Sequence, residues 1–88
     1  MKSLLETLTR ELVDEPDRVF VTERSADGTT LLQLGVAPED RGYVIGKRGR
    51  TVDALRTVLD AVAGRNGGRC RLEIVDHERP LARRADEP

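Results

Sequence analysis

The residues best suited to chemistry in this chain of 88 residues form a short basic loop. Gly46 and Gly49 bracket two cations, Lys47 and Arg48, at the junction of two apolar runs with helical spacing. Glycine lacks a Cβ atom, so it can adopt positive φ and let backbone N–H groups approach another molecule. If a helix begins near Thr51, its unpaired N–H groups and its dipole add positive charge at the same place. The pattern predicts a binding site for an anion, and phosphate is the obvious ligand.

The distribution of charge supports an anionic partner, although the formal net charge of the chain is only −1. Residues 41–71 contain eight basic and two acidic residues, whereas the rest contains seven basic and fourteen acidic residues. A basic face can therefore bind a polyanion while acidic surface elsewhere supports solubility. The alternative is that single cations, such as Arg56 or Arg65, merely form a solvated face.

Several other kinds of site are not expected. Cys70 is the only cysteine, and without a Cys/His cluster we expect no disulfide, metal or cofactor. We interpret Cys70 as a small buried residue on a strand, and His77 as a solvated residue without a fixed nucleophile or carboxylate beside it. We therefore expect no enzyme activity. The chain begins with neither a signal nor a transit pattern and has no membrane-length apolar run, so we expect a cytoplasmic protein.

The N-terminal segment is predicted to form a helix with one apolar face. The spacing of Ser3 and Glu6 is typical of a capping box, so the helix should begin there. Its apolar stripe consists of Leu4, Leu5, Leu8 and Leu12. Pro16 ends the helix, and residues 14–17 are predicted to form the turn out of it.

Two strands are expected next, at residues 18–24 and 29–36, joined as an antiparallel hairpin by the Asp27-Gly28 dipeptide. Alternation in the second strand directs Leu32, Leu34 and Val36 to the core. Gly35 weakens that strand and often marks the close approach of another backbone or a ligand.

The basic loop is predicted to lie between a short and a long helix. Residues 37–40 introduce the short one, whose apolar part is Tyr43, Val44 and Ile45, and Gly46 ends it. From Arg50 a long helix follows, ended by Gly64 and residues 66–68. Its apolar stripe consists of Val52, Leu55, Val58, Leu59 and Val62.

A third strand at residues 69–75 should bury Cys70, Leu72 and Ile74, and residues 77–88 are expected to be a disordered charged tail. The fold class is therefore α+β, with a three-stranded sheet covered on one face by helices. With only two aromatic residues in the chain, the core must be aliphatic.

Two nucleotide-binding templates do not fit the loop. A P-loop needs four residues between its glycines and a Ser or Thr after the Lys. Here Gly42 and Gly46 are separated by three residues, and Lys47 is followed by Arg48. The dinucleotide-binding Gly-x-Gly-x-x-Gly pattern is absent as well.

Helix, Gly-x-x-Gly and helix is instead the arrangement of KH domains, whose loop clamps a four-nucleotide backbone. Residues 44–50 (Val-Ile-Gly-Lys-Arg-Gly-Arg) resemble the KH signature, and the element order is similar to the type II, bacterial form. The chain length, residues 36–40 and residues 72–75 resemble the small bacterial KH proteins of the KhpA (YlqC) family. The resemblance covers a single domain, residues 3–76.

This resemblance implies that single-stranded RNA binds in a narrow groove, with Gly46 to Gly49 against its sugar-phosphate backbone. Lys47, Arg48 and Arg50 would contact phosphates, with Arg41 a weaker candidate. Ile45 and Val52 would form an aliphatic floor for the bases, although both could equally be core residues. No aromatic side chain lies in the loop to stack on bases, so one domain should bind weakly and with strong salt dependence.

The resemblance also implies protein partners. Members of the family are homodimers and partners of a larger KH protein of the KhpB/Jag type, and they are linked to RNA chaperoning and cell shape. An RNA chaperone or post-transcriptional regulator is therefore the first hypothesis. The alternative is a protein-interaction module that pairs with itself or with a KhpB/Jag-type protein, with RNA binding secondary.

Overall fold

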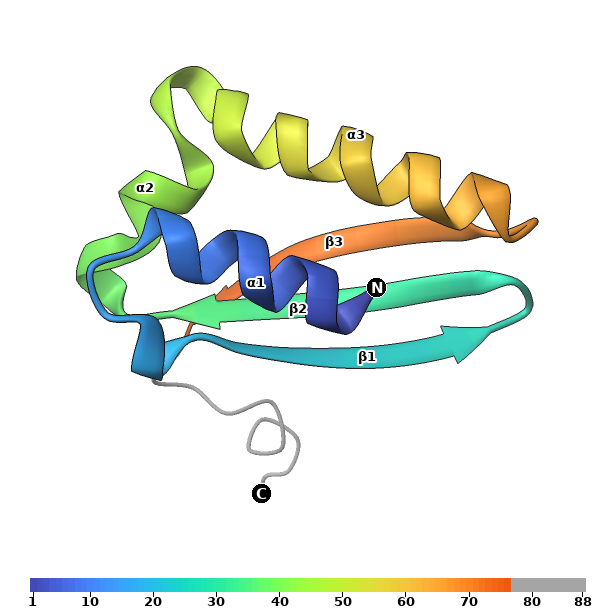
Figure 1. The fold of residues 1–88 in the computed structure, drawn as a ribbon, viewed down its shortest axis with the longest axis horizontal. Helices are drawn as coiled ribbons and strands as arrows, with labels where there is room; N and C mark the ends of the chain where they lie inside the picture. The colour runs from blue at the N-terminus through green and yellow to red at the C-terminus, as the bar shows by residue number, and fades with distance from the viewer. Residues whose placement is uncertain (77–88) are drawn as a thin grey trace.

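The computed structural model describes residues 1–76, which form a helical layer on a three-stranded sheet (Figure 1). The elements in chain order are α1 (Lys2–Leu12), β1 (Phe20–Ala26), β2 (Thr29–Val36), α2 (Arg41–Ile45), α3 (Arg50–Arg65) and β3 (Arg69–Asp76). Three 3₁₀ turns join them: η1 (Pro16–Arg18), η2 (Pro38–Asp40) and η3 (Lys47–Gly49). The predicted fold class and element order are confirmed.

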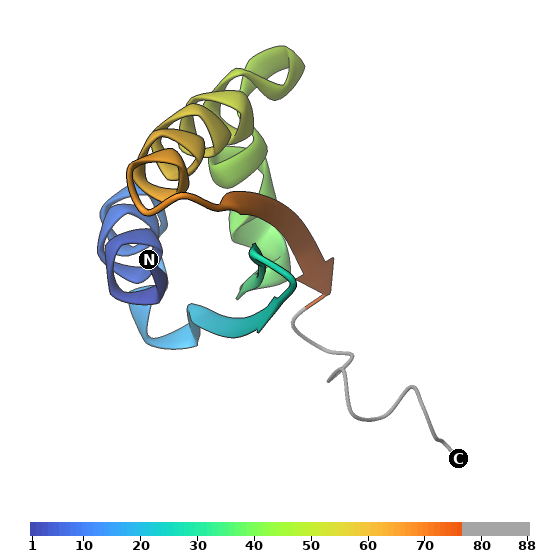
Figure 2. The ribbon, with the colours of Figure 1, turned by 90° about the vertical axis from the view of Figure 1, so that its right-hand side faces the viewer.

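The sheet has the order β1-β2-β3, so β2 is central and β3 is an edge strand. β1 pairs with β2 antiparallel, and β2 pairs with β3 parallel. Seen from the end, α1 and α3 lie on the same side of the sheet (Figure 2). A parallel neighbour requires a crossover, and the α2-loop-α3 segment supplies it. This connection places the basic loop where the chain leaves β2.

The hairpin forms where its turn residues predict it. Asp27 and Gly28 both have positive φ, 52° and 78°, as a two-residue type I′ turn requires. β2 has the predicted bounds, whereas β1 begins at Phe20 rather than residue 18 because Pro16–Arg18 form the turn η1.

The core is aliphatic and lies between the sheet and the helices. Leu32, Leu34 and Val36 of β2 are at most 1% exposed, as predicted. Leu72 of β3 is buried with them, and Cys70 and Ile74 are partly buried. The helices contribute Leu5, Val44, Val52, Leu55, Leu59 and Ala63.

Three details of the helices differ from the sequence predictions. The capping box is wrong, since α1 begins at Lys2 and no side chain caps it; the Leu5 N–H donates to the Met1 carbonyl at 3.0 Å. Leu12, the last residue of α1, is 37% exposed, and Thr9 takes the buried position one turn after Leu5. On α3, Val58 is 42% exposed, because the buried sector of that helix is centred on Leu55, Leu59 and Ala63.

The close approach at Gly35 comes from a side chain, not from another backbone or a ligand. Phe20 of β1 is the register partner of Gly35, and its ring occupies the space that a Cβ atom on Gly35 would need. The aromatic ring thus covers the glycine of the neighbouring strand, a known way of stabilising glycine in sheets.

One buried carboxylate fixes the start of α2. Asp40 is 1% exposed, and its Oδ2 accepts a hydrogen bond of 3.0 Å from the N–H of Glu15. The bond ties the connection after α1 to the residue that precedes α2. It therefore helps to hold the helix that leads into the basic loop.

The predicted tail at 77–88, including His77, lies outside the described residues. Within residues 1–76, no helix has the length and apolar character needed to cross a bilayer. In that same part of the chain, no three His, Cys, Asp or Glu side chains are grouped to hold a metal ion.

Candidate nucleic-acid interface

The basic loop is a tight 3₁₀ turn between two helices. The Gly46 N–H donates to the Gly42 carbonyl at 2.8 Å, which ends α2, and the Gly49 N–H donates to the Gly46 carbonyl at 3.1 Å. Three of its four residues have positive φ: 77° at Gly46, 57° at Arg48 and 76° at Gly49. Side chains disfavour this conformation, so the two glycines allow the turn to close.

The two glycines have different surroundings. A Cβ atom on Gly46 would collide with the Thr51 hydroxyl and lie 2.8 Å from the Thr51 backbone nitrogen. The same atom on Gly49 would meet only a Val52 methyl group, at 4.0 Å. Gly46 is therefore packed against the first turn of α3, whereas the space beside Gly49 can admit another molecule.

The loop cations are exposed and available for an anion. Lys47, Arg48 and Arg50 are all exposed, and Arg41 is exposed one helical turn before the loop. Within residues 1–76 the ion pairs are Arg18–Glu15 and Arg56–Asp53, so none of these four cations has an acidic partner there. The structure brings Lys47, Arg48 and Arg50 together, with Arg41 at the far end of α2.

The N-terminus of α3 adds to this positive charge. Gly49 is its N-cap residue and no side chain caps it, so N–H groups of the first turn have no acceptor within the helix. The dipole of this 16-residue helix also places partial positive charge at the loop. Asp53 in the first turn opposes that charge, but its carboxylate pairs with Arg56 at 3.5 Å.

The two residues proposed as an aliphatic floor occupy different environments. Ile45, beside Gly46, is 38% exposed and can contact a ligand. Val52 is 7% exposed and belongs to the core cluster, so it offers at most an edge of its side chain.

A cleft lies between the middle of α3 and the first half of β3, and the sequence did not reveal it. It is lined by Arg56, Asp60, Cys70, Arg71 and Leu72. Arg56 lies six residues after Arg50, about 9 Å along the helix axis. β3 contributes its outer edge, which no other strand of residues 1–76 pairs with.

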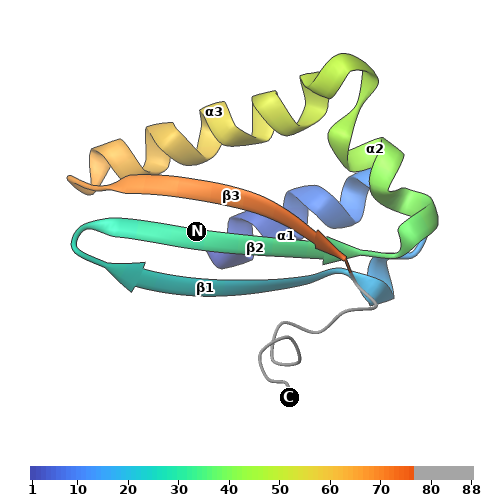
Figure 3. The ribbon, with the colours of Figure 1, turned by 180° about the vertical axis from the view of Figure 1, so that it is seen from behind.

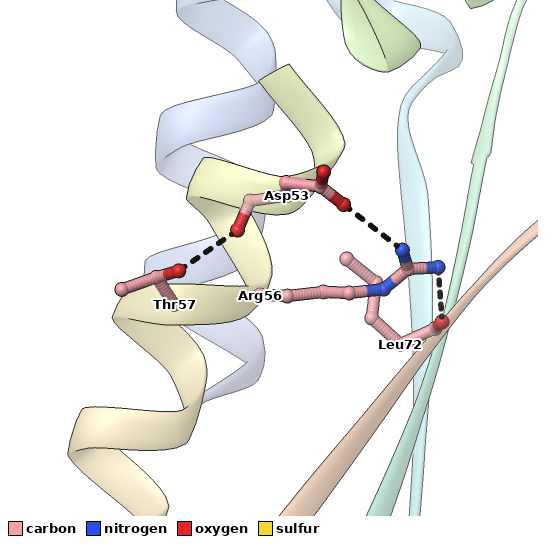
Figure 4. A network of polar contacts seen from close by, with 4 residues as sticks. All are labelled: Asp53, Arg56, Thr57 and Leu72. Atoms are coloured by element: carbon pink, nitrogen blue, oxygen red, sulfur yellow. Dashed lines mark hydrogen bonds and ion pairs between the residues drawn. The ribbon is translucent and has the colours of Figure 1, made fainter. Parts of the chain in front are cut away.

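Arg56 joins the two walls of this cleft (Figure 4). Its Nη2 donates to the Leu72 carbonyl at 3.4 Å, and its Nη1 lies 3.5 Å from Asp53 Oδ1. The Thr57 hydroxyl donates to the Asp53 carbonyl at 3.0 Å. Arg56 is thus more than a solvated cation; the only sequence signal for its role was an acid three residues earlier.

Cys70 lines the cleft as a neutral thiol. Burial raises its pKa, and the negative charges of Asp60 and Glu23 raise it further. A raised pKa reduces the thiolate fraction and hence the nucleophilicity. This agrees with the interpretation of Cys70 as a packing residue on a strand.

Comparison with known proteins agrees with this geometry. The family model described as the KH domain of KhpA/KhpB matches residues 2–74. The chain is 49% identical over 75 residues to a protein from Clostridium acetobutylicum named RNA-binding protein KhpA, covering 85% of this chain and all of that protein.

Proteins with the same name from two further bacteria are also similar. The one from Halalkalibacterium halodurans is 46% identical over 76 residues, which cover 86% of this chain and the whole relative. The one from Treponema pallidum is 48% identical over 75 residues, which cover 85% of this chain and 94% of the relative. These names describe binding proteins rather than enzymes. No solved structure matched the chain significantly.

Proposed function

Because the chain belongs to the KhpA/KhpB family of KH-domain proteins, we propose that it binds single-stranded RNA through its Gly46–Gly49 loop. The observation that carries the proposal is the exposed cluster of Lys47, Arg48 and Arg50, which has no ion-pair partner in the described chain, at the N-terminus of α3. The names of the relatives support RNA as the ligand.

In the proposed complex the loop holds the sugar-phosphate backbone. The open space at Gly49 lets a phosphate approach the backbone, and the cations on either side neutralise it. Arg41 adds a longer-range attraction from the start of α2. Ile45, with the exposed edge of Val52, contacts a base beside the loop. Since few phosphates fit this short site, binding is weak and falls steeply with salt.

The test is a charge reversal with a matched control. Lys47→Asp plus Arg48→Asp should lower the affinity for single-stranded RNA more than tenfold at low salt, since about two phosphate contacts become repulsive. Fluorescence anisotropy measures the affinity at several salt concentrations. The slope of log affinity against log salt should be smaller in magnitude by about 1.4, or 0.7 per lost contact. The control, Lys2→Asp plus Arg10→Asp, makes the same charge change on α1 and should bind nearly as well. Equal affinities for the parent and the loop variant would refute the proposal.

A second candidate function is pairing with another KH chain, and an exposed row on α3 favours it. Ala54, Val58 and Ala61 are exposed at helical spacing. We propose that this row contacts either a second copy of the chain or a KhpB/Jag-type KH protein. Two loops on one assembly would raise the avidity of weak single-domain binding.

Sedimentation at micromolar concentration tests the pairing. The parent should form a dimer, and Val58→Asp should give a monomer because it places charge in an apolar contact. Leu12→Asp, which changes a similarly exposed apolar residue on α1, should stay dimeric. A parent that is monomeric both alone and with the KhpB/Jag-type protein, or a Val58→Asp variant that still pairs, would count against this interface.

The cellular role proposed here is that of a cytoplasmic RNA chaperone or post-transcriptional regulator linked to cell shape. It is supported by the resemblance to the family and not by a particular contact. Crosslinking in cells tests this role. Sequencing then identifies the RNA bound to the protein, and the bound protein partners are identified in the same sample. Recovery of no RNA above the level of the Lys47→Asp plus Arg48→Asp variant would refute it.

A further inference from the structure

The face of the sheet opposite the helices has a cationic end. Viewed from behind, the three strands lie in front of α1, and within residues 1–76 no helix covers this face (Figure 3). The strand register arranges its side chains in rows across the three strands. Phe20 lies over Gly35 at one end, followed by a row of Thr22, Gln33 and Glu73. The next row consists of Arg24, Leu31 and Arg71.

The arginine row forms a hollow over an apolar residue. Arg24 and Arg71 are exposed and flank Leu31, which is only partly buried. With strands about 4.8 Å apart, the two arginine Cα atoms are separated by about 10 Å. The hollow has a volume of about 360 Å³ and is also lined by Thr29 and Glu73. Arg69 occupies the following row, beside Thr29, and adds a third cation.

These arginines have no acidic partner among the described residues. Neither of the two ion pairs in residues 1–76 involves Arg24, Arg69 or Arg71. Glu73 is the acid that lines the hollow, but its Oε1 accepts a 3.0 Å hydrogen bond from Gln33 Nε2. Gln33 in turn accepts from the Thr22 hydroxyl at 3.2 Å. This ladder holds the carboxylate in the neighbouring row, so the hollow keeps a positive balance.

Arg71 connects this hollow to the α3–β3 cleft. It lines both the outer hollow and the α3–β3 cleft, because β3 is the edge strand between them. A series of cations therefore extends from Arg56, on the wall of the cleft, through Arg71 to Arg24. Arg50 lies about 9 Å before Arg56 along the axis of α3. Such a series suits a linear polyanion better than a compact acidic patch on a protein, which would need only one end of it.

We infer that the outer sheet face is a second RNA-binding surface: a strand held at the Gly46–Gly49 loop passes the β3 edge at Arg71 and continues to Arg24. This inference rests on the proposed function and extends it. The phosphates contact the guanidinium groups, and a base or sugar lies on the apolar surface of Leu31. Short RNA engages the loop alone, so the sheet surface contributes only to longer strands.

The test compares two RNA lengths in two variants. The short probe is about four nucleotides, the length that a KH loop clamps, and the long probe is about twelve. Arg24→Thr plus Arg71→Thr keeps residues that favour strands. It should bind the short RNA like the parent and the long RNA roughly tenfold more weakly, with a salt slope smaller by about 1.4 for two lost contacts. Lys2→Thr plus Arg10→Thr is the control with the same charge change, and it should bind both RNAs like the parent.

The outcomes separate the two proposals. If Arg24→Thr plus Arg71→Thr leaves the affinity for long RNA unchanged, or weakens it no more than the control does, the second surface is refuted. An equal loss for both lengths also refutes it, because the arginines would then act at the loop. Poly-glutamate and unlabelled RNA are then compared as competitors of the labelled long RNA. If poly-glutamate displaces it with equal efficiency, the sheet surface binds an acidic polypeptide instead. If the loop variant leaves short-RNA binding unchanged, the proposed function itself fails.

Discussion

Replacing Gly46 by alanine should be far more damaging than replacing Gly49, although both glycines have nearly the same φ. Gly46 has φ 77° and ψ 170°, a region that is open essentially to glycine alone, and side chains there cost about 1–3 kcal/mol. The added Cβ atom would also lie 2.8 Å from the Thr51 backbone nitrogen, so the start of α3 must move. We expect Gly46→Ala to lower the free energy of unfolding by about 3 kcal/mol or more.

Gly49 provides the matched comparison. Its φ of 76° and ψ of 13° lie in the left-handed region, where alanine costs about 1–2 kcal/mol, and its Cβ would meet nothing closer than 4.0 Å. Gly42→Ala is the second control, because Gly42 lies within α2 with open space around it. Alanine there should raise the free energy of unfolding by about 0.5–1 kcal/mol.

Urea and thermal unfolding followed by circular dichroism measure these differences. For a domain of this size, about 1 kcal/mol corresponds to about 4–8 °C, so Gly46→Ala should unfold more than about 12 °C below the parent. Adding Thr51→Ala should recover only part of the loss, since it removes the hydroxyl but not the backbone nitrogen. Equal destabilisation by Gly46→Ala and Gly49→Ala would refute the reasoning, as would full rescue by Thr51→Ala.

Two further predictions concern a buried hydroxyl and a partly buried thiol. Thr9 is 0% exposed and its Oγ1 has no hydrogen-bond partner among residues 1–76, so Thr9→Val should raise the free energy of unfolding by about 1 kcal/mol in urea titrations; a loss of stability would show that the hydroxyl is hydrogen-bonded. Because the pKa of Cys70 is raised in the folded state, iodoacetamide at pH 8 should react more slowly with the native chain than with the urea-unfolded chain. The same shift means that this thiol contributes stability below its unfolded pKa, which is lost as pH rises through the higher folded value. Equal alkylation rates would contradict both statements.

The sequence was most informative where structure depends on neighbouring residues alone. The Asp27-Gly28 turn and the bounds of β2 follow from turn chemistry and from alternation. The end of α2 at Gly46 follows from the conformational freedom of glycine. The loop itself could be identified because its backbone needs glycines at fixed positions.

Errors arose where periodicity had to be converted into burial. A helical period fixes the angles between side chains, but not which sector of the helix meets the sheet. Leu12 and Val58 were therefore placed on buried stripes, whereas packing leaves both exposed and buries Thr9. The capping box failed because the N-cap of α1 is Met1, two residues before Ser3.

The sequence by itself determined the element order, the Gly-x-x-Gly loop and its charge, because each depends on contacts between residues close in the chain. Only the tertiary structure decided that β3 lies parallel to β2, which brings Arg56 to the carbonyl of Leu72 and sets Arg71 across from Arg24. Strand order depends on which crossover buries the most apolar surface, and no local pattern records it. The two hollows that meet at Arg71 are a consequence of that packing.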